Sequence, residues 1–148
     1  NLFENDLKNV HNILFLGDNA GEIVFDRVFI ELLNTFKIPV TFAVKEYHIL
    51  NDAMKSDAED VGIDKIAKVI STGSGIIGTE LNDCSKDFLK LFHNSDLIIS
   101  KGQGNFETLR EFDGPVYFVL RAKCNPVARE LGVKKDEVVF KKTGTTVQ

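Results

Sequence analysis

The sequence predicts an α/β fold: a doubly wound, mainly parallel sheet with helices on both faces, in a three-layer sandwich. Apolar runs of strand length alternate with segments of helical period along nearly the whole chain, which is the pattern of βαβ units. The length of 148 residues suits one domain, and the hydrophobic content of 43% and charged content of 27% are typical of a globular protein. No repeat, low-complexity tract or linker interrupts the alternation. We therefore expect residues 1–148 to form a single α/β domain.

Six short apolar runs predict the strands. They are five to eight residues long, rich in Val, Ile and Phe, and bounded by polar corners. Runs of this kind, apolar at almost every position, are typical of strands that are buried on both faces of a sheet. The predicted strands are Asn12–Gly17, Pro39–Lys45, Ile66–Ser71, Asp96–Ser100, Pro115–Ala122 and a last short strand, Glu137–Lys142.

Helical periodicity fills the segments between these strands. The first ten residues read as the end of a helix that leads into the first strand, and segments of helical period separate the later strands. After the first strand these residues are Ile23, Val24, Val28, Phe29, Leu32 and Leu33, and after the third strand Phe88, Leu89, Leu91 and Phe92 are expected to form a buried face.

Composition and charge exclude several classes of protein. A net charge of -4 argues against a protein that binds nucleic acid, and the longest apolar runs are far shorter than the roughly 20 residues that span a membrane. The first residues lack the pattern of a signal peptide. Cys84 and Cys124 lie far apart, with no CxxC or Cys/His cluster, so neither a disulfide scaffold nor a zinc site is predicted. We expect a cytoplasmic protein with no nucleic-acid or membrane partner, and the oligomeric state is left open.

Polar and glycine-rich loops follow four of the predicted strands. Right-handed crossovers bring the loops after parallel strands to one edge of the sheet, where open α/β sheets bind their ligands. The stretch LGDNAGEIVFD is the first of these corners. The four loops contribute Asp18 and Asn19, then Asn51 and Asp52, then KGQGN (101–105), and finally RAK (121–123).

Asp18, Asn19 and Asp52 together predict a divalent metal site. Two carboxylates and an amide oxygen form a hard, all-oxygen ligand set that suits Mg²⁺ or Mn²⁺ and does not suit zinc. Three protein ligands also leave positions open for water and a phosphate oxygen. The competing interpretation is that Asp18 caps the following helix and Asn19 shapes the turn, as such residues often do.

Two acids on the next helix are candidates to support this site. Glu22 and Asp26 lie four residues apart and therefore on one helix face. Acids in a first helical turn commonly serve the helix dipole and solvent, which is the simpler interpretation of Glu22. Asp26 lies deeper among apolar residues and is the better candidate to orient a metal ligand. Asn51, next to Asp52, is a third supporting candidate.

The loop KGQGN predicts an anion cradle opposite the metal. Gly102 and Gly104 allow the backbone to approach a ligand closely, and a helix starting near Asn105 would point free N–H groups at an anion. Lys101 adds a positive charge suited to phosphate. A metal and an anion cradle are the minimal equipment for phosphoryl chemistry.

Other site types are disfavoured. The segment GSGIIG, with Gly73, Gly75 and Gly78, matches a dinucleotide-binding pattern, but TELND follows it in place of a continuous helix. His11, His48 and His93 show no metal-ligand spacing, and the sequence has no G-x-S-x-G nucleophile elbow. Haloacid-dehalogenase phosphatases carry Asp-x-Asp after the first strand, whereas this chain has Asp-Asn-Ala.

The motifs LGDNAGEIVFD, NDAMKSDA, SKGQGNFE and LRAKC followed by LGV resemble those of the domain-of-unknown-function-89 family, the metal-dependent damage-control phosphatases. The resemblance extends from Ile13 to Val139, with the motifs in the same order. It implies hydrolysis of phosphomonoesters of small metabolites, including sugar phosphates and damaged or surplus cofactor intermediates. It also implies a divalent metal, Mn²⁺, Mg²⁺, Co²⁺ or Ni²⁺. Members usually carry a helical region before the first strand, so we expect this chain to be the C-terminal part of a longer architecture.

The resemblance also assigns roles to residues. It implies that Asp18 and Asn19 bind the metal with Asp52 as the third ligand, for which Asp57 is the alternative. The phosphate-holding lysine would be Lys123, although some members have Arg-Thr-x-Lys here, which leaves Arg121 open. The family's glycine-rich motif falls on Lys101, Gly102, Gly104 and Asn105.

The expected mechanism is metal-assisted hydrolysis of a phosphomonoester. Lys123 and Lys101 would neutralise the transferring group, and Asp52 or Asp18 would orient the attacking water. The alternative is a non-catalytic domain that binds or senses a phosphorylated metabolite through the same loops.

Overall fold

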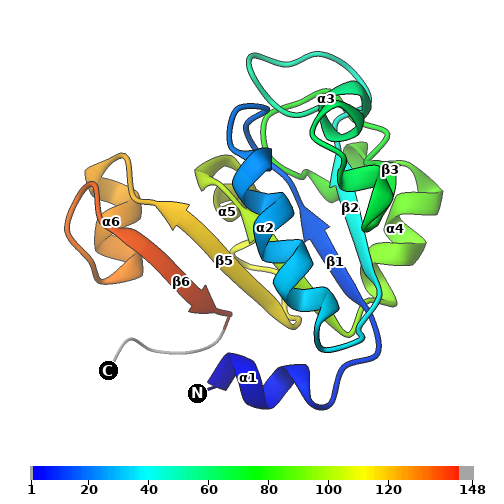
Figure 1. The fold of residues 1–148 in the computed structure, drawn as a ribbon. Helices are drawn as coiled ribbons and strands as arrows, with labels where there is room; N and C mark the ends of the chain where they lie inside the picture. Colours follow the sequence, from blue (N-terminus) through cyan, green and yellow to red (C-terminus); the bar gives the residue numbers. More distant parts are fainter. Residues whose placement is uncertain (1, 144–148) are drawn as a thin grey trace.

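The predicted strands pair into one six-stranded sheet with helices packed against it (Figure 1). The computed structural model describes residues 2–143 of the chain. Five strands run parallel, and the last pairs antiparallel with the fifth at one edge, which confirms the predicted α/β fold. The strands are β1 (Ile13–Leu16), β2 (Val40–Val44), β3 (Lys68–Ser71), β4 (Leu97–Lys101), β5 (Val116–Arg121) and β6 (Val138–Lys142). The helices are α1 (Leu2–Leu7), α2 (Ile23–Asn34), α3 (Lys55–Asp60), α4 (Lys86–His93), α5 (Gln103–Leu109) and α6 (Asn125–Leu131), with short 3₁₀ turns at Ile63–Lys65 and Leu81–Asp83.

The order of strands, β3-β2-β1-β4-β5-β6, creates a reversal in the middle of the sheet. The chain moves from β1 outward to β2 and β3, and it then returns to place β4 on the other side of β1. The loops after β1 and β4 therefore leave the sheet side by side but lead in opposite directions. In doubly wound sheets this reversal opens the crevice in which ligands bind.

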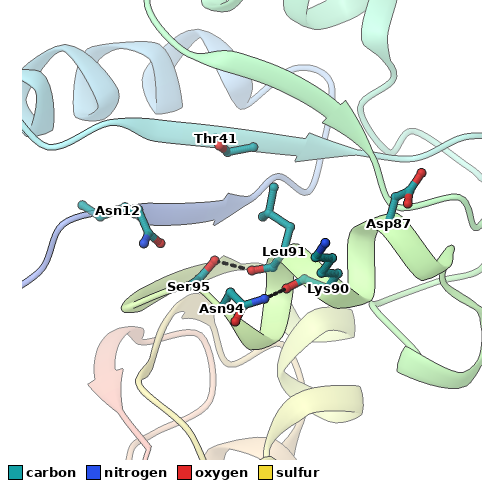
Figure 2. Close-up of a pocket in the computed structure, with 8 residues that line it drawn as sticks. Asn12, Thr41, Asp87, Lys90, Leu91, Asn94 and Ser95 are labelled. Carbon is teal, nitrogen blue, oxygen red and sulfur yellow. Dashed lines mark hydrogen bonds between the residues drawn. The ribbon is translucent and has the colours of Figure 1, made fainter.

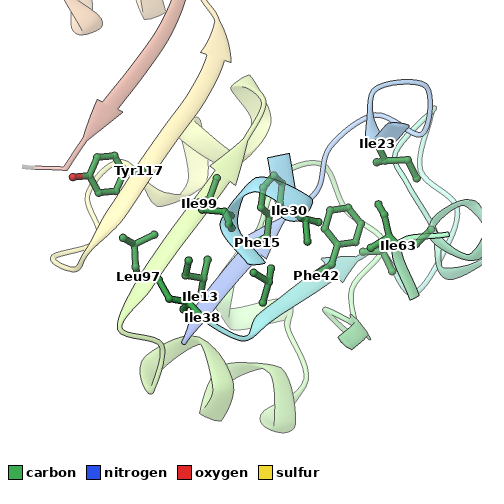
Figure 3. Close-up of a cluster of buried hydrophobic side chains, with 14 of the residues drawn as sticks. Ile13, Phe15, Ile23, Ile30, Ile38, Phe42, Ile63, Leu97, Ile99 and Tyr117 are labelled. Carbon is green, nitrogen blue, oxygen red and sulfur yellow. The ribbon is translucent and has the colours of Figure 1, made fainter. Parts of the chain in front are cut away.

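Both faces of the central strands are buried. Alternate residues of a strand point to opposite faces, so Phe15 belongs to one hydrophobic cluster and Leu14 to the other. Figure 3 shows the first cluster, in which Phe15 and Phe42 lie with Ile30 of α2. The second cluster includes side chains of α4, α5 and α6, such as Phe88 of α4. This double burial explains why the strands have no polar face in the sequence.

Helix α2 is apolar on more than one side. It buries Ile23 and Leu33 against the sheet, but it leaves other members of the predicted periodic set exposed. Phe25, outside that set, is 74% exposed. In α4 the predicted face is clearer, because Phe88 and Phe92 are fully buried and the neighbouring leucines are half-buried. The exposed apolar residues of α2 are Val24, Phe25, Val28 and Leu32.

Helix α1 is tied to the far edge of the sheet by one carboxylate. Asp6 accepts hydrogen bonds from the Tyr117 hydroxyl of β5, at 2.7 Å, and from the ammonium of Lys142 at the end of β6. The hydrogen bond from Lys142 holds the pKa of Asp6 below its usual value. Among residues 2–143 no helix has both the length and the apolar character needed to cross a membrane.

Candidate functional site

The loops that follow β1 and β2 are joined by backbone hydrogen bonds. The Ala53 amide donates to the Asp18 carbonyl at 2.7 Å, and the Ala20 amide donates to the Asn51 carbonyl at 2.8 Å. Asn19 and Asp52 face each other in the short antiparallel bridge that results. The three residues predicted to bind a metal therefore lie together at the carboxyl edge of the sheet, beside the reversal between β1 and β4.

The side chain of Asn19 has an unsatisfied oxygen. Its Nδ2 donates to Asp18 Oδ2 at 3.2 Å, whereas its Oδ1 is buried and has no hydrogen-bond partner among the described residues. A buried amide oxygen without a partner is destabilising, and such atoms commonly face an ion or an ordered water. One amide oxygen and two carboxylates also form a set of donors that a hard divalent cation prefers. The residues therefore fit the predicted metal.

Asp52 opposes the ionisation of Asp18. Burial, together with the negative charges of Asp52 and Glu22, raises the pKa of Asp18 from its ordinary value of 3.8 to about 6 against the pull of the nearby lysines. Burial likewise raises the pKa of Asp52, although the charge of Lys45 lowers it. The site thus favours a bound proton or a bound cation over two free carboxylates.

Two alternatives to the predicted metal ligands were a capping role for Asp18 and the use of Asp57 in place of Asp52. Helix α2 begins after Glu22, whose side chain makes no capping bond, so Asp18 does not cap it. Asp57 lies in the first turn of α3, where its carboxylate accepts a 2.8 Å hydrogen bond from the Met54 amide. Asn51 is exposed and contributes its backbone carbonyl to the bridge. The geometry favours Asp52 over Asp57 as the third member of the cluster.

Gly102 is the residue that makes room for the Asp18 carboxylate. It has a φ of 86°, and a Cβ added to it would lie 2.1 Å from Asp18 Oδ2. Helix α5 starts directly after it at Gln103, two residues before the predicted start near Asn105. Any side chain here would displace Asp18, so the glycine is required by the neighbouring acid as well as by the turn.

Asn105 ties the loops of the site together. It is buried, and its Oδ1 accepts a 2.8 Å hydrogen bond from the hydroxyl of Thr79. Its Nδ2 donates to the carbonyls of Lys101, at 2.7 Å, and Gly17, at 3.3 Å. This network holds the end of β4 against the residue that precedes Asp18. The predicted contact between Asn105 and a phosphate stays a prediction.

Lys101 is held by the two acids of α2. Its ammonium lies 2.6 Å from Asp26 Oδ1 and 3.8 Å from Glu22 Oε2. Asp26 is only 3% exposed, and burial raises its pKa although the charge and hydrogen bond of Lys101 act in the opposite direction. Sequence reasoning expected Asp26 to orient a metal ligand, but the structure joins it to the lysine. Its contact with Lys101 fixes the position of that cation.

A pocket of about 580 Å³ opens beside these residues. Asp18, Lys101 and Gly102 line one side of it, and Lys123 lines it from the loop after β5. The Gln103 side chain accepts a 2.9 Å hydrogen bond from the Lys123 amide, which positions this loop against α5. The remaining lining residues are Glu22, Phe25, Gln103, Val119, Leu120, Arg121 and Val138.

The two basic residues of RAK differ in their partners. Arg121 forms a 3.2 Å salt bridge with Asp136. Lys123 is exposed and has no salt-bridge partner among the described residues, yet its charge acts on Asp18. Its ammonium is therefore the more available of the two cations.

Sequence reasoning missed Lys45, which directly follows β2. It is buried, and its ammonium lies 3.9 Å from Asp52 Oδ2. Its position at a strand end was visible in PVTFAVK, as that of Lys101 was. Its hydrogen-bond partner, the carbonyl of Gly78, comes from a loop 33 residues away, so the sequence around Lys45 gives no sign that the side chain is buried.

A second hollow, of about 420 Å³, lies under α4, away from the predicted residues (Figure 2). Its lining includes Asn12 and Thr41 near the starts of β1 and β2, so it belongs to the opposite end of the strands. The side chains of Asn94 and Ser95 donate to backbone carbonyls of α4. These polar groups serve the helix end and do not converge on a ligand.

Comparison with known proteins identifies relatives over most of the chain. Residues 1–139 match the damage-control phosphatase ARMT1-like domain. A damage-control phosphatase of Pyrococcus horikoshii is 46% identical over 140 residues, which cover 93% of this chain and 48% of the relative. A damage-control phosphatase of Archaeoglobus fulgidus is 37% identical over 133 residues, 87% of this chain and 46% of the relative. An uncharacterised protein of Methanocaldococcus jannaschii is 50% identical over 145 residues, 93% of this chain and 48% of the relative.

The fold of a solved relative agrees with this structure. The crystal structure of a DUF89 family protein from Pyrococcus horikoshii superimposes with a TM-score of 0.91 at 45% sequence identity, covering 96% of this chain and 50% of the other. This chain therefore spans about half the length of the relatives it matches.

We predict that Gly102→Ala destabilises the protein by about 1–3 kcal/mol, the usual cost of a side chain in a backbone conformation that it rarely adopts. The new Cβ also displaces the Asp18 carboxylate. Gly21→Ala is the matched control, because a Cβ there meets nothing within 4 Å. Thermal melting compares the two variants, and equal melting temperatures would show that Gly102 does not constrain Asp18.

We predict that Asp18→Asn stabilises the metal-free protein at pH 7.5 and has little effect at pH 4. The folded-state pKa of Asp18 is raised, so the native state binds this proton more tightly than the unfolded state does, and wild-type stability falls as pH rises from about 4 through 6. At 1.36 kcal/mol per pKa unit the gain is at most about 3 kcal/mol, and partial exposure reduces it. Chemical denaturation with a chelator present measures it, and a gain that is the same at both pH values would contradict the assignment.

Proposed function

The chain belongs to the damage-control phosphatase ARMT1-like domain family, and we propose that it is a metal-dependent phosphomonoester hydrolase acting on small phosphorylated metabolites. Two relatives that carry the name damage-control phosphatase support the phosphatase activity. The observation that carries the rest is the cluster at the strand reversal. There Asn19, whose Oδ1 has no hydrogen-bond partner among the described residues, bonds Asp18 through its Nδ2 and is bridged to Asp52 through the backbone, and Asp18 lines a pocket that Lys123 also lines.

Asp18, Asn19 and Asp52 would hold the metal, with Mn²⁺, Mg²⁺, Co²⁺ or Ni²⁺ as the candidates. What a bound divalent ion supplies in such a site is positive charge for the phosphate oxygens and a lower pKa for water. Burial raises the pKa of both Asp18 and Asp52, and neighbouring acids add to the effect at Asp18; a bound cation would favour the ionised form of each carboxylate. One of these two acids then orients the attacking water.

The cations around the pocket take different parts in the proposed reaction. Lys123 reaches the pocket without a competing carboxylate among the described residues, so its charge is available to the transferring phosphoryl group. Lys101 is fixed by Asp26 and contributes a positive charge at a set position. Fixed cations of this kind stabilise negative charge on phosphoryl oxygens best when they need not move during the reaction.

Turnover of para-nitrophenyl phosphate by the purified chain with Mn²⁺ or Co²⁺ tests the proposal, followed by a panel of phosphorylated metabolites. We expect activity that a chelator abolishes and that Asp18→Ala removes while the domain still folds. The second candidate function is a domain that senses a phosphorylated metabolite through the same loops. Binding of such a metabolite, without turnover at any metal concentration, would favour the sensor.

We predict that Lys123→Ala lowers kcat by roughly 100-fold or more, the scale seen when one fixed electrostatic partner of a transition state is removed. Mn²⁺ affinity should change little, because Lys123 is not among the proposed ligands. Arg121→Ala is the matched control, since Arg121 is paired with Asp136. Steady-state kinetics at saturating metal distinguishes them, and a loss confined to Arg121→Ala would exchange the roles of the two residues.

A further inference from the structure

Lys45 is a buried cation that the proposed mechanism does not use. Its side chain is 6% exposed at the end of β2, and its ammonium donates a hydrogen bond to the carbonyl of Gly78. Burial lowers the pKa of Lys45, and the negative charges of nearby groups, Asp52 first among them, only partly oppose this effect. A methionine of similar length would fill the same space without a desolvated charge. The ammonium therefore calls for an explanation other than packing.

The backbone and the side chain of Lys45 both contact the loop that carries Asp52. The Lys45 amide donates to the Ala53 carbonyl at 3.0 Å, and Lys45 pairs with Met54 in a short parallel bridge. The ammonium lies 3.9 Å from Asp52 Oδ2. One carboxylate oxygen of Asp52 thus faces a fixed positive charge, which restricts the orientation of the other oxygen.

The carbonyl that receives the Lys45 ammonium belongs to the glycine-rich segment GSGIIG. Gly78 has a φ of 76°, and a Cβ there would lie 2.5 Å from the carbonyl oxygen of Gly104 in α5. The next residue, Thr79, donates its hydroxyl to Asn105. The segment is therefore packed tightly against α5, and its Gly78 carbonyl gives the Lys45 ammonium a second fixed partner besides Asp52.

We propose that Lys45 is a positioning residue, which holds the Asp52 carboxylate in the orientation that a divalent cation requires and is itself fixed by Gly78. The inference rests on the proposed function, because it assigns Asp52 to the metal. Groups that hydrogen-bond or pair with metal ligands typically change metal affinity by 10–100-fold when they are removed.

The direction in which cation affinity changes when Lys45 is removed distinguishes a positioning role from an effect of its charge alone. A positive charge near a metal repels it, so if Lys45 acted only through its charge, its removal would tighten cation binding. If Lys45 orients Asp52, its removal weakens binding in spite of the lost repulsion. A purely structural role for Lys45 would leave the affinity unchanged.

Calorimetric titration of the metal-free chain with Mn²⁺ provides the test. We expect Lys45→Met to weaken Mn²⁺ binding about tenfold or more, and Lys45→Arg, which retains the charge and a donor, to recover part of the loss. Lys55→Met is the matched control, since Lys55 is exposed on α3 and pairs only with Glu59 among the described residues. Equal or tighter binding by Lys45→Met would overturn the proposal.

A second measurement needs no metal and detects loss of the fold. Thermal melting of the metal-free wild type, Lys45→Met, Asp52→Asn and the double variant forms a double-mutant cycle. If Lys45 pairs with Asp52, the change caused by Asp52→Asn is more unfavourable with Lys45 present than in the Lys45→Met background. Equal changes in both backgrounds would overturn the pairing. A wild-type chain that binds no Mn²⁺ would overturn the metal-dependent function, while the cycle would still decide whether Lys45 holds Asp52.

Discussion

The hydrogen bond from the Ala53 amide to the Asp18 carbonyl is the contact on which the arrangement of the site depends. It joins the corner after β1 to the loop after β2, and it brings Asn19 opposite Asp52. Together with the bond from the Ala20 amide to the Asn51 carbonyl, it fixes the two acids, which lie on separate loops, relative to each other. Because the bond is between backbone atoms, it does not use the side chains of the proposed metal ligands, and the Oδ1 of Asn19 has no hydrogen-bond partner among the described residues.

Gly102, which follows β4 on the other side of the strand reversal, also restricts the position of Asp18. Gly102 lets β4 turn into α5 directly against the Asp18 carboxylate, and Asn105 then bonds back to the carbonyl that precedes Asp18. The charges gathered in this space destabilise one another, since burial and neighbouring acids raise the pKa of Asp18. The two hydrophobic clusters, one on each face of the sheet, stabilise the fold that holds these charges together. Such local destabilisation is common where a protein prepares a site for a ligand.

The sequence predicted the fold class and most of the carboxyl edge because strand ends are visible in it. Asp18, Lys101 and Lys123 all follow recognisable apolar runs, and parallel strands deliver their ends to one edge. The choice between Asp52 and Asp57 depended on a backbone bridge that no periodicity reveals. Contacts between distant segments were also beyond reach, such as the pairing of Lys101 with Asp26, 75 residues away. The side of α2 that faces the sheet was ambiguous because the helix is apolar on more than one side.

Asp6 makes the attachment of the first helix dependent on pH. By bonding Lys142 and Tyr117, this carboxylate holds α1 against the ends of β5 and β6 that lie opposite the pocket (Figure 1). The hydrogen bond from Lys142 lowers the pKa of Asp6, so this contact contributes stability that is present above the ordinary pKa of 3.8 and is lost as the pH falls through the lower folded-state value. The pKa of Asp18 is shifted in the opposite direction. Acidification therefore loosens the attachment of α1 while it relieves the repulsion between the acids of the site.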